Sequence, residues 1–134
     1  MYLFQEGESW GMLRLGHLML LWSGLQMALV LPHKPRLNGI DLGGAELGNA
    51  SLAFATITKD TKLNGAYFGN ADLSLGHFAA ADLSGIDLYG ASLFLTDLRG
   101  ANLKEANLNS ANLNGANLSG ADLSQAALSN AEVA

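Results

Sequence analysis

A five-residue repeat constrains the fold of this chain more than any other feature. Residues 81–130 divide into the blocks ADLSG, IDLYG, ASLFL, TDLRG, ANLKE, ANLNS, ANLNG, ANLSG, ADLSQ and AALSN, all ten with Leu at the third place. On a straight helix a step of five residues turns through about 500°, so these leucines would scatter around the cylinder. In a straight strand an odd step alternates between faces. The chain must therefore bend once per block and wind into a closed coil, which predicts an all-β solenoid.

Each position of the repeat has a predicted role. In a block such as ANLNG, alternation places the central Leu and the Ala two residues before it inside, and the Asn or Asp between them outside. The last two positions are mostly Gly, Ser and Asn, which turn corners at little cost because they tolerate a positive φ or bond to nearby backbone. The predicted structural core is the central column of leucines: Leu83, Leu88, Leu93, Leu98, Leu103, Leu108, Leu113, Leu118 and Leu123.

The blocks follow the pattern A(D/N)LxX, and in this the sequence resembles the pentapeptide repeat family over residues 37–134. The resemblance implies a right-handed quadrilateral β-helix with four blocks in each coil, and a protein of the cyanobacterial type. Centres at every fifth residue from Leu37 to Ile57 and from Leu63 to Val133 number 5 + 15 = 20. At four blocks per coil, the resemblance therefore implies about five coils of solenoid.

The spacing between the centres Ile57 and Leu63 is six residues instead of five. A one-residue insertion near 58–62 can be accommodated at a corner without moving the stacked columns. The sequence therefore predicts a bulged corner near Lys59 and Asp60. It also predicts two segments, a hydrophobic leader over 1–36 and the β-helix over 37–134.

The leader allows several readings. Residues 12–31 are largely apolar, and a helix there would be long enough either to cap the first coil or to anchor the chain in a membrane. Arg14 would be costly inside a membrane, whereas Lys34 and Arg36 just beyond the segment would keep the repeats on the cytoplasmic side. A start misassigned upstream of Met27 is a further alternative. We therefore expect a cytoplasmic protein, membrane-associated if residues 12–31 anchor it.

Composition and architecture argue against catalysis. The chain has no cysteine, which excludes thiol chemistry, and its predicted axis is filled by leucine, which leaves no convergent pocket. His77 takes an outward place as an isolated imidazole, and the five-residue spacing does not match the nine-residue blocks of calcium-binding β-helices. We therefore expect no enzyme activity, no cofactor and no metal. The net charge of −5, with seven scattered Lys and Arg residues, disfavours direct binding to nucleic acid.

A noncatalytic protein-interaction scaffold is the predicted function, because solenoids present flat, rigid surfaces. The family resemblance supplies an alternative, a DNA-mimicking protein that binds or protects gyrase, a type II topoisomerase. The short rod and the many asparagines place this alternative second, and a membrane-anchored repeat protein is a further alternative. The C-terminal coil, with Leu118, Leu123, Leu128 and Val133, has no evident cover, so we expect either a homodimer through that coil, which is favoured, or a frayed final coil.

One corner of the predicted coil carries unusual residues. With 20 residues in each coil after Leu63, Phe54, Leu75 and Leu95 stand in one column, with Phe94 beside it. Corners are otherwise mostly Gly, Ser or Asn, so these four residues form an apolar stripe on a polar rod. Contiguous apolar patches usually mark a contact. Phe54, Leu75, Phe94 and Leu95 are therefore the candidate protein-interaction surface, to be covered either by the leader or by an external partner.

Overall fold

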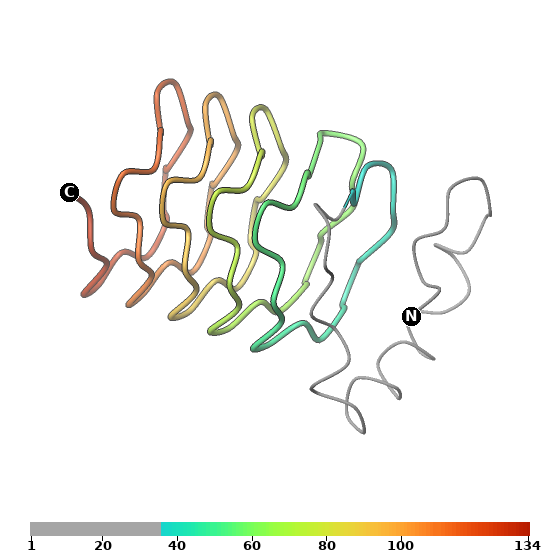
Figure 1. Cartoon of the computed structure of the whole chain (residues 1–134), viewed down its shortest axis with the longest axis horizontal. Helices are drawn as coiled ribbons and strands as arrows, with labels where there is room; N and C mark the ends of the chain where they lie inside the picture. Colours follow the sequence, from blue (N-terminus) through green and yellow to red (C-terminus); the bar gives the residue numbers. More distant parts are fainter. Residues whose placement is uncertain (1–35) are drawn as a thin grey trace.

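The computed structural model describes residues 36–134, which wind into coils stacked from residue 36 to the C-terminus (Figure 1). Among these residues there is no helix, and each face of a coil contributes a single bridging residue rather than a longer strand. All the bridges between coils are parallel. The expected leader, with its cap and anchor alternatives over 12–31, lies outside the described residues.

The bridges fix the register of the stacking. After the insertion the partners are 20 residues apart, as in Tyr67 with Asp87 and Asp82 with Asn102. Across the insertion they are 21 apart, as in Asp41 with Lys62. The centres of stacked blocks define the faces. Two faces matter below: the Leu73 face, with centres Leu52, Leu73, Leu93, Leu113 and Val133, and the Leu83 face, with centres Leu42, Leu63, Leu83, Leu103 and Leu123.

The corner of each block is a tight turn. The carbonyl of Leu103, for example, accepts a hydrogen bond from the N–H of Ala106 at 3.1 Å, and Glu105 between them has a φ of 60°. A positive φ at the second corner position is the mark of a type II turn. Within residues 36–134, eighteen corners have it, eight with Gly and ten with other residues. The short polar and glycine residues of the last two repeat positions follow from this geometry.

Every backbone N–H of a typical block has a partner, as the block 101–105 shows. Ala101 donates to the carbonyl of Leu98 in the turn that leads into the block, Asn102 donates to the coil before, and Leu103 and Glu105 donate to the coil after. The N–H of Lys104 has no backbone acceptor and instead donates to Asn102 Oδ1 at 3.1 Å. Because backbone donors need a partner, this side chain completes the block. The Asp or Asn of the repeat is therefore a cap for the first corner N–H.

Ten blocks carry this side-chain cap, with distances of 2.9–3.2 Å from Oδ1 to the N–H two residues on. The capping residues are Asp41, Asp72, Asp82, Asp87, Asp97, Asn102, Asn107, Asn112, Asn117 and Asp122. Asn102 and Asn107 also donate across coils, to Asp82 and Asp87. These two asparagines thus bond both to turn backbone and to the neighbouring coil.

The axis is filled by the central column. Its leucines from Leu83 to Leu113 are at most 2% exposed. Leu118 and Leu123, which belong to the same predicted core, are only half-buried, because residues 36–134 supply no further coil to stack on them. Phe78 replaces Leu in the column, and a Cβ on Gly76 would approach its ring to 2.6 Å. The larger centre is therefore matched by a smaller residue two places before it.

The extra residue lies in a turn from Thr58 to Thr61, where the N–H of Thr61 donates to the carbonyl of Thr58 at 3.0 Å. Thr61 is buried, and its hydroxyl donates to the carbonyl of Leu37 at 2.7 Å. Next to this turn the ladder is interrupted. Among the described residues, the N–H groups of Leu63, Gly65 and Asp82 have no acceptor, unlike their counterparts in neighbouring blocks. The insertion therefore loosens the Leu83 face between two coils.

Candidate interaction surface

The apolar corner stripe consists of Phe54, Leu75, Phe94 and Leu95, on the Leu73 face. Backbone bonds place its members in register: Phe54 donates to the carbonyl of Ser74, and Leu75 donates to that of Phe94, both at 2.8 Å. All four side chains are between 37% and 48% exposed. Leu95 also extends across the next corner, where a Cβ on Gly115 would meet its Cδ2 at 2.6 Å. The stripe is continuous along three coils and leans onto the fourth.

The stripe residues occupy costly backbone positions. Phe54, Leu75 and Leu95 have φ values of 63°, 59° and 56°. A left-handed backbone disfavours residues with a Cβ by roughly 1–2 kcal/mol, and Gly and Asn bear it best. The other non-glycine residues at positive φ are Asn49, Asn70, Ala80, Glu105, Ser110, Gln125 and Asn130. All three large apolar residues at such corners therefore stand in one column, and unfavourable conformations of this kind tend to gather at functional positions.

Two uncapped backbone donors lie beside the stripe. Ser51 and Ser92 stand where Asp or Asn caps other blocks, and the N–H groups of Ala53 and Phe94 have no acceptor among the described residues. The Ser92 hydroxyl is instead 2.7 Å from that of Ser74. We did not predict these two uncapped N–H groups from the sequence. The serine in the capping place of the repeat is the signal that could have revealed them.

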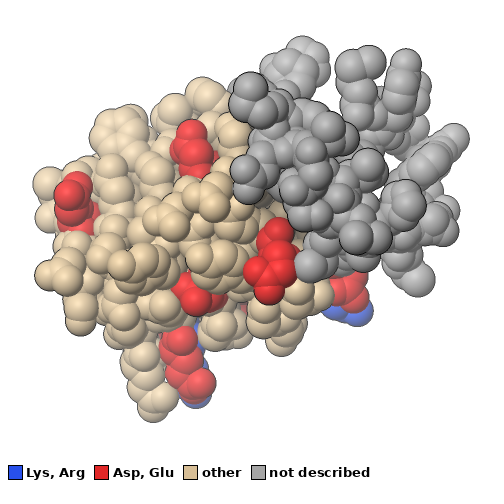
Figure 2. Space-filling view, turned by 90° about the horizontal axis from the view of Figure 1, so that it is seen from below, with Lys and Arg blue, Asp and Glu red and all other residues tan. Residues whose placement is uncertain are grey.

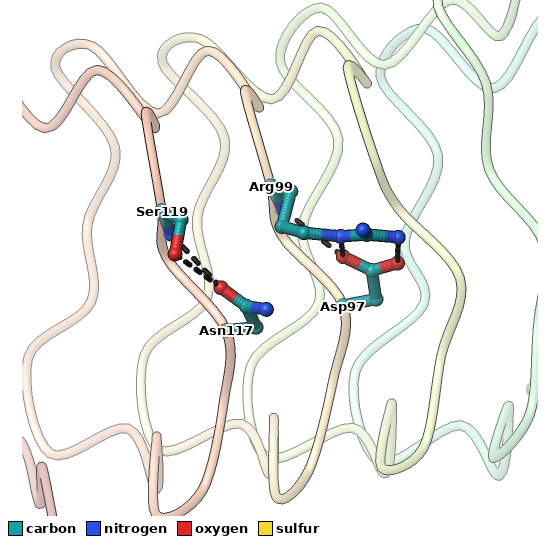
Figure 3. A network of polar contacts seen from close by, with 4 residues as sticks. All are labelled: Asp97, Arg99, Asn117 and Ser119. Atoms are coloured by element: carbon teal, nitrogen blue, oxygen red, sulfur yellow. Dashed lines mark hydrogen bonds and ion pairs between the residues drawn. The ribbon is translucent and has the colours of Figure 1, made fainter.

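The other corners and faces are polar and supported by local contacts. Arg99 donates twice to the carboxylate of Asp97, at 2.8 and 2.7 Å, and one coil further Asn117 caps Ser119 (Figure 3). The hydrogen bonds from Arg99 lower the pKa of Asp97 to about 2. Contacts with Ser124, its side chain first, lower the pKa of Asp122. These acids are held in structural contacts on the surface.

The charged residues of the described part form separate patches. In the view of Figure 2 the acidic side chains are separated by uncharged surface. Lys62 lies 3.6 Å from Asp41, Lys104 lies 3.6 Å from Glu105, and Arg99 pairs with Asp97. Several acids are thus neutralised by the chain's own cations. No group of three or more His, Asp or Glu residues within 36–134 is placed to hold a metal ion, and His77 is exposed.

A second exposed apolar area lies at the C-terminal coil. Leu128 is 40% exposed and Val133 is 66% exposed. One cap here comes from another coil: the methyl side chain of Ala127 cannot accept a hydrogen bond, and the N–H of Ser129 donates to Asn109 Oδ1 at 2.8 Å instead. The edge of this coil is therefore apolar at its centres and polar at its corners.

The fold and surface together define a β-solenoid with polar faces, an axis packed with leucine and one apolar corner stripe. The family model for pentapeptide repeats matches it in eight copies, over residues 59–100 and 96–132. The chain belongs to the pentapeptide repeat family, which confirms the resemblance read from the blocks. Membership supports the expected right-handed β-helix. No curated protein sequence matches the chain.

Several solved structures are similar. A pentapeptide repeat protein, Rfr23, from the cyanobacterium Cyanothece 51142 is 31% identical, with 74% of this chain and 60% of that chain covered and a TM-score of 0.42. One from the Arabidopsis thaliana thylakoid lumen is 26% identical, with 74% and 61% covered and a TM-score of 0.48. QnrB1, a plasmid-mediated fluoroquinolone resistance protein, is 20% identical, with 74% and 68% covered and a TM-score of 0.31. The chain spans about three fifths of the first two proteins.

Within residues 36–134, no helix is long and apolar enough to cross a membrane. The segment considered as an anchor, 12–31, lies outside that range.

Proposed function

We propose that this protein is a noncatalytic interaction scaffold, a right-handed rod of about five coils whose contact surface is the apolar corner stripe. The observation that carries the proposal is the single column of large apolar residues at positive-φ corners. A positive φ costs these residues conformational free energy. Their side chains are partly exposed to water, so burial within the solenoid offsets little of that cost. Contact with another polypeptide surface would compensate through burial, at roughly 25 cal/mol for each Å² of apolar area removed from water.

The rest of the described surface favours binding over chemistry. The axis that could have formed a pocket is filled by leucines at most 2% exposed. The polar side chains of the described part bond to their own turns or to a neighbour in the next coil, as Asn102 does to Asp82. A rigid solenoid of this kind presents preformed faces, which lowers the entropy cost of binding. The stripe would supply apolar anchors, and the N–H groups of Ala53 and Phe94 would supply donors at its border.

The experiment replaces the stripe by carboxylates in the full chain, as Leu75→Asp with Leu95→Asp. We expect the circular dichroism melt to change little, because Asp tolerates a positive φ better than Leu. Self-association in sizing, protection from limited proteolysis, or capture of a defined partner should be lost. Ala80→Asp, at a positive-φ corner of another face, is the matched control. If the double variant behaves like the control in all three measurements, the stripe is not a contact surface.

The gyrase alternative receives less support from the described surface. A mimic of DNA needs a dense row of negative charge along a rod. Here Asp41, Asp97 and Glu105 are paired with cations, and Asn102 separates Asp82 from Asp122 in its column. We therefore expect purified full-length protein to leave gyrase supercoiling of plasmid DNA unchanged. Inhibition or protection at stoichiometric amounts would restore this alternative.

The other expectations concern assembly and location. A homodimer through the C-terminal coil remains a proposal, supported by the exposure of Leu128 and Val133. A membrane-anchored repeat protein remains the third alternative, and fractionation of the protein expressed from Met1 between membranes and cytosol tests it.

A further inference from the structure

The chain enters the solenoid next to one end of the stripe. Arg36, the first described residue, forms a parallel bridge with Thr56, and the N–H of Leu37 donates to the carbonyl of Thr56 at 2.9 Å. Phe54 precedes Thr56 by two residues. Two residues span at most about 7 Å, and neighbouring coils are about 4.8 Å apart. The 35 residues before Arg36 are therefore attached within roughly 12 Å of the stripe.

The tethered chain has the composition that the stripe requires. Residues 12–31 are largely apolar and include Trp22. The stripe covers three coils, about 10 Å from its first to its last backbone position, so a segment of that length can reach all of it. Tethering gives such a segment an effective concentration of the order of millimolar, well above that of a free partner. Proximity and composition thus favour the chain's own segment.

The remaining exposed apolar residues of the described part are less suitable for this segment. Tyr89 stands alone on another face, and Leu128 and Val133 lie at the opposite end of the rod from Arg36 (Figure 1). The blocks of the Leu73 face, over 51–54, 72–75, 92–95 and 112–115, contain no Lys or Arg. Asp72 is the one charged residue in these blocks, and its carboxylate caps the N–H of Ser74. A strip without cations, bordered by two N–H donors that have no acceptor within residues 36–134, suits an apolar segment that brings backbone carbonyls.

We infer that residues 12–31 pack along the apolar corner stripe of the same molecule. The inference rests on the proposed function, since it names the occupant of the same surface. It differs from an end cap, which would cover the edge of the first coil and would not reach Leu95. The stripe is then occupied within one molecule, and an external partner must displace residues 12–31 before it binds.

Tryptophan fluorescence tests the inference, because both tryptophans, Trp10 and Trp22, precede the described residues. In a full-length Trp10→Phe background, Trp22 is the single reporter. We compare the stripe variant Leu75→Asn with Leu95→Asn against the control Ala80→Asn. Asn already occupies positive-φ corners at Asn49 and Asn70, so these variants should fold. Trp22 should become severalfold more accessible to acrylamide in the stripe variant alone, and trypsin should cleave faster after Arg14.

The outcomes separate the two proposals. Equal shielding of Trp22 in the stripe variant and the control overturns the inference. Shielding that depends on protein concentration, or that appears only with phospholipid vesicles, also overturns it, because the occupant is then a second copy or a lipid surface. If the stripe variant loses a defined partner or self-association while Trp22 is unchanged, the proposed function stands and the inference falls. If nothing changes, both fall.

Discussion

At the scale of residues, the repeat is explained by one hydrogen bond in each block. Asp or Asn precedes the central Leu because the first corner N–H has no backbone acceptor, as Lys104 and Asn102 show. Leu fills the axis, and Ala fits where two chain segments approach. Where a position departs from the pattern, a neighbour compensates: Gly76 makes room for Phe78, and Asn109 caps Ser129. The first compensation comes from within the same block, and the second comes from the neighbouring coil, 20 residues away.

The first prediction concerns the central column. Leu103→Ala or Leu108→Ala should lower the free energy of unfolding by about 2–5 kcal/mol, because both side chains are fully buried and leave a cavity. Denaturant melts measure the change. Lys104→Ala, at an exposed corner of the same block, is the control and should cost little. Equal stability of all three variants would show that the column does not carry the core.

The second prediction concerns the pair of Asp97 and Arg99. The pKa of Asp97 in the fold is about 2, against about 3.9 in an unfolded chain, so the pair stabilises the fold above that higher value. This contribution is lost as pH falls toward 2. Asp97→Asn keeps a cap for the N–H of Arg99 but removes the charge. The difference in unfolding free energy between the two proteins should therefore shrink between pH 5 and pH 2.

Melts of wild type, Asp97→Asn and Arg99→Gln over this pH range provide the measurement. Both variants remove the same ion pair, so both differences from wild type should follow the same trend. A difference that is constant or grows on acidification would contradict the assignment.

At the scale of elements, the insertion turn is the point where the ladder weakens. On one side of the turn, the Thr61 hydroxyl donates to the carbonyl of Leu37 and links two coils. On the other side, the N–H groups of Leu63, Gly65 and Asp82 have no acceptor among the described residues. The next bond along, from Asp87 to the carbonyl of Ala66, is long at 3.3 Å. The bulky Ile86 lies buried just before it, in a place that is usually Ala. The extra residue is thus absorbed by local loss of pairing while the column of centres stays continuous.

The third prediction follows from this gap. The amides of Leu63 and Gly65 should exchange with deuterium faster than those of Phe68 and Asn70, which occupy the same block positions and donate to the next coil at 2.8 Å. Exchange depends on local hydrogen bonding and opening. Nuclear magnetic resonance of the full chain measures each amide, and equal protection of both pairs would show that the ladder closes in solution.

At the scale of the whole molecule, the described rod has two candidate surfaces for assembly, the apolar corner stripe and the edge of the C-terminal coil. The described rod has one apolar stripe along its side and exposed centres at its C-terminal coil. An open coil edge offers unpaired backbone groups together with apolar side chains, which favours pairing with another chain. The polar faces between these surfaces carry isolated charged residues. Their polar side chains bond mainly to backbone and side chains of the same rod. Association should therefore involve the stripe or the C-terminal edge.

The fourth prediction concerns that edge. Leu128→Glu with Val133→Glu should shift a concentration-dependent dimer toward monomer, because charges would replace the exposed centres. Light scattering measures the mass, and Tyr89→Glu, at an exposed aromatic position two coils before the C-terminal edge, should leave it unchanged. A wild type that stays monomeric at high concentration, with slow amide exchange at residues 120–130, would contradict pairing at this end.

The solenoid class and the inward column could be predicted from the sequence, because a five-residue period leaves only one way to place every Leu inside. The apolar corner stripe also required the 20 residues per coil that the resemblance to pentapeptide repeats implies. The alignment of Phe54 with Leu75 across the insertion followed from counting residues. The loss of pairing at Leu63, the cap that Asn109 supplies to Ser129 and the free N–H groups of Ala53 and Phe94 required the tertiary structure. Each depends on which backbone group lies opposite in the next coil, and that is decided by stacking rather than by any local pattern.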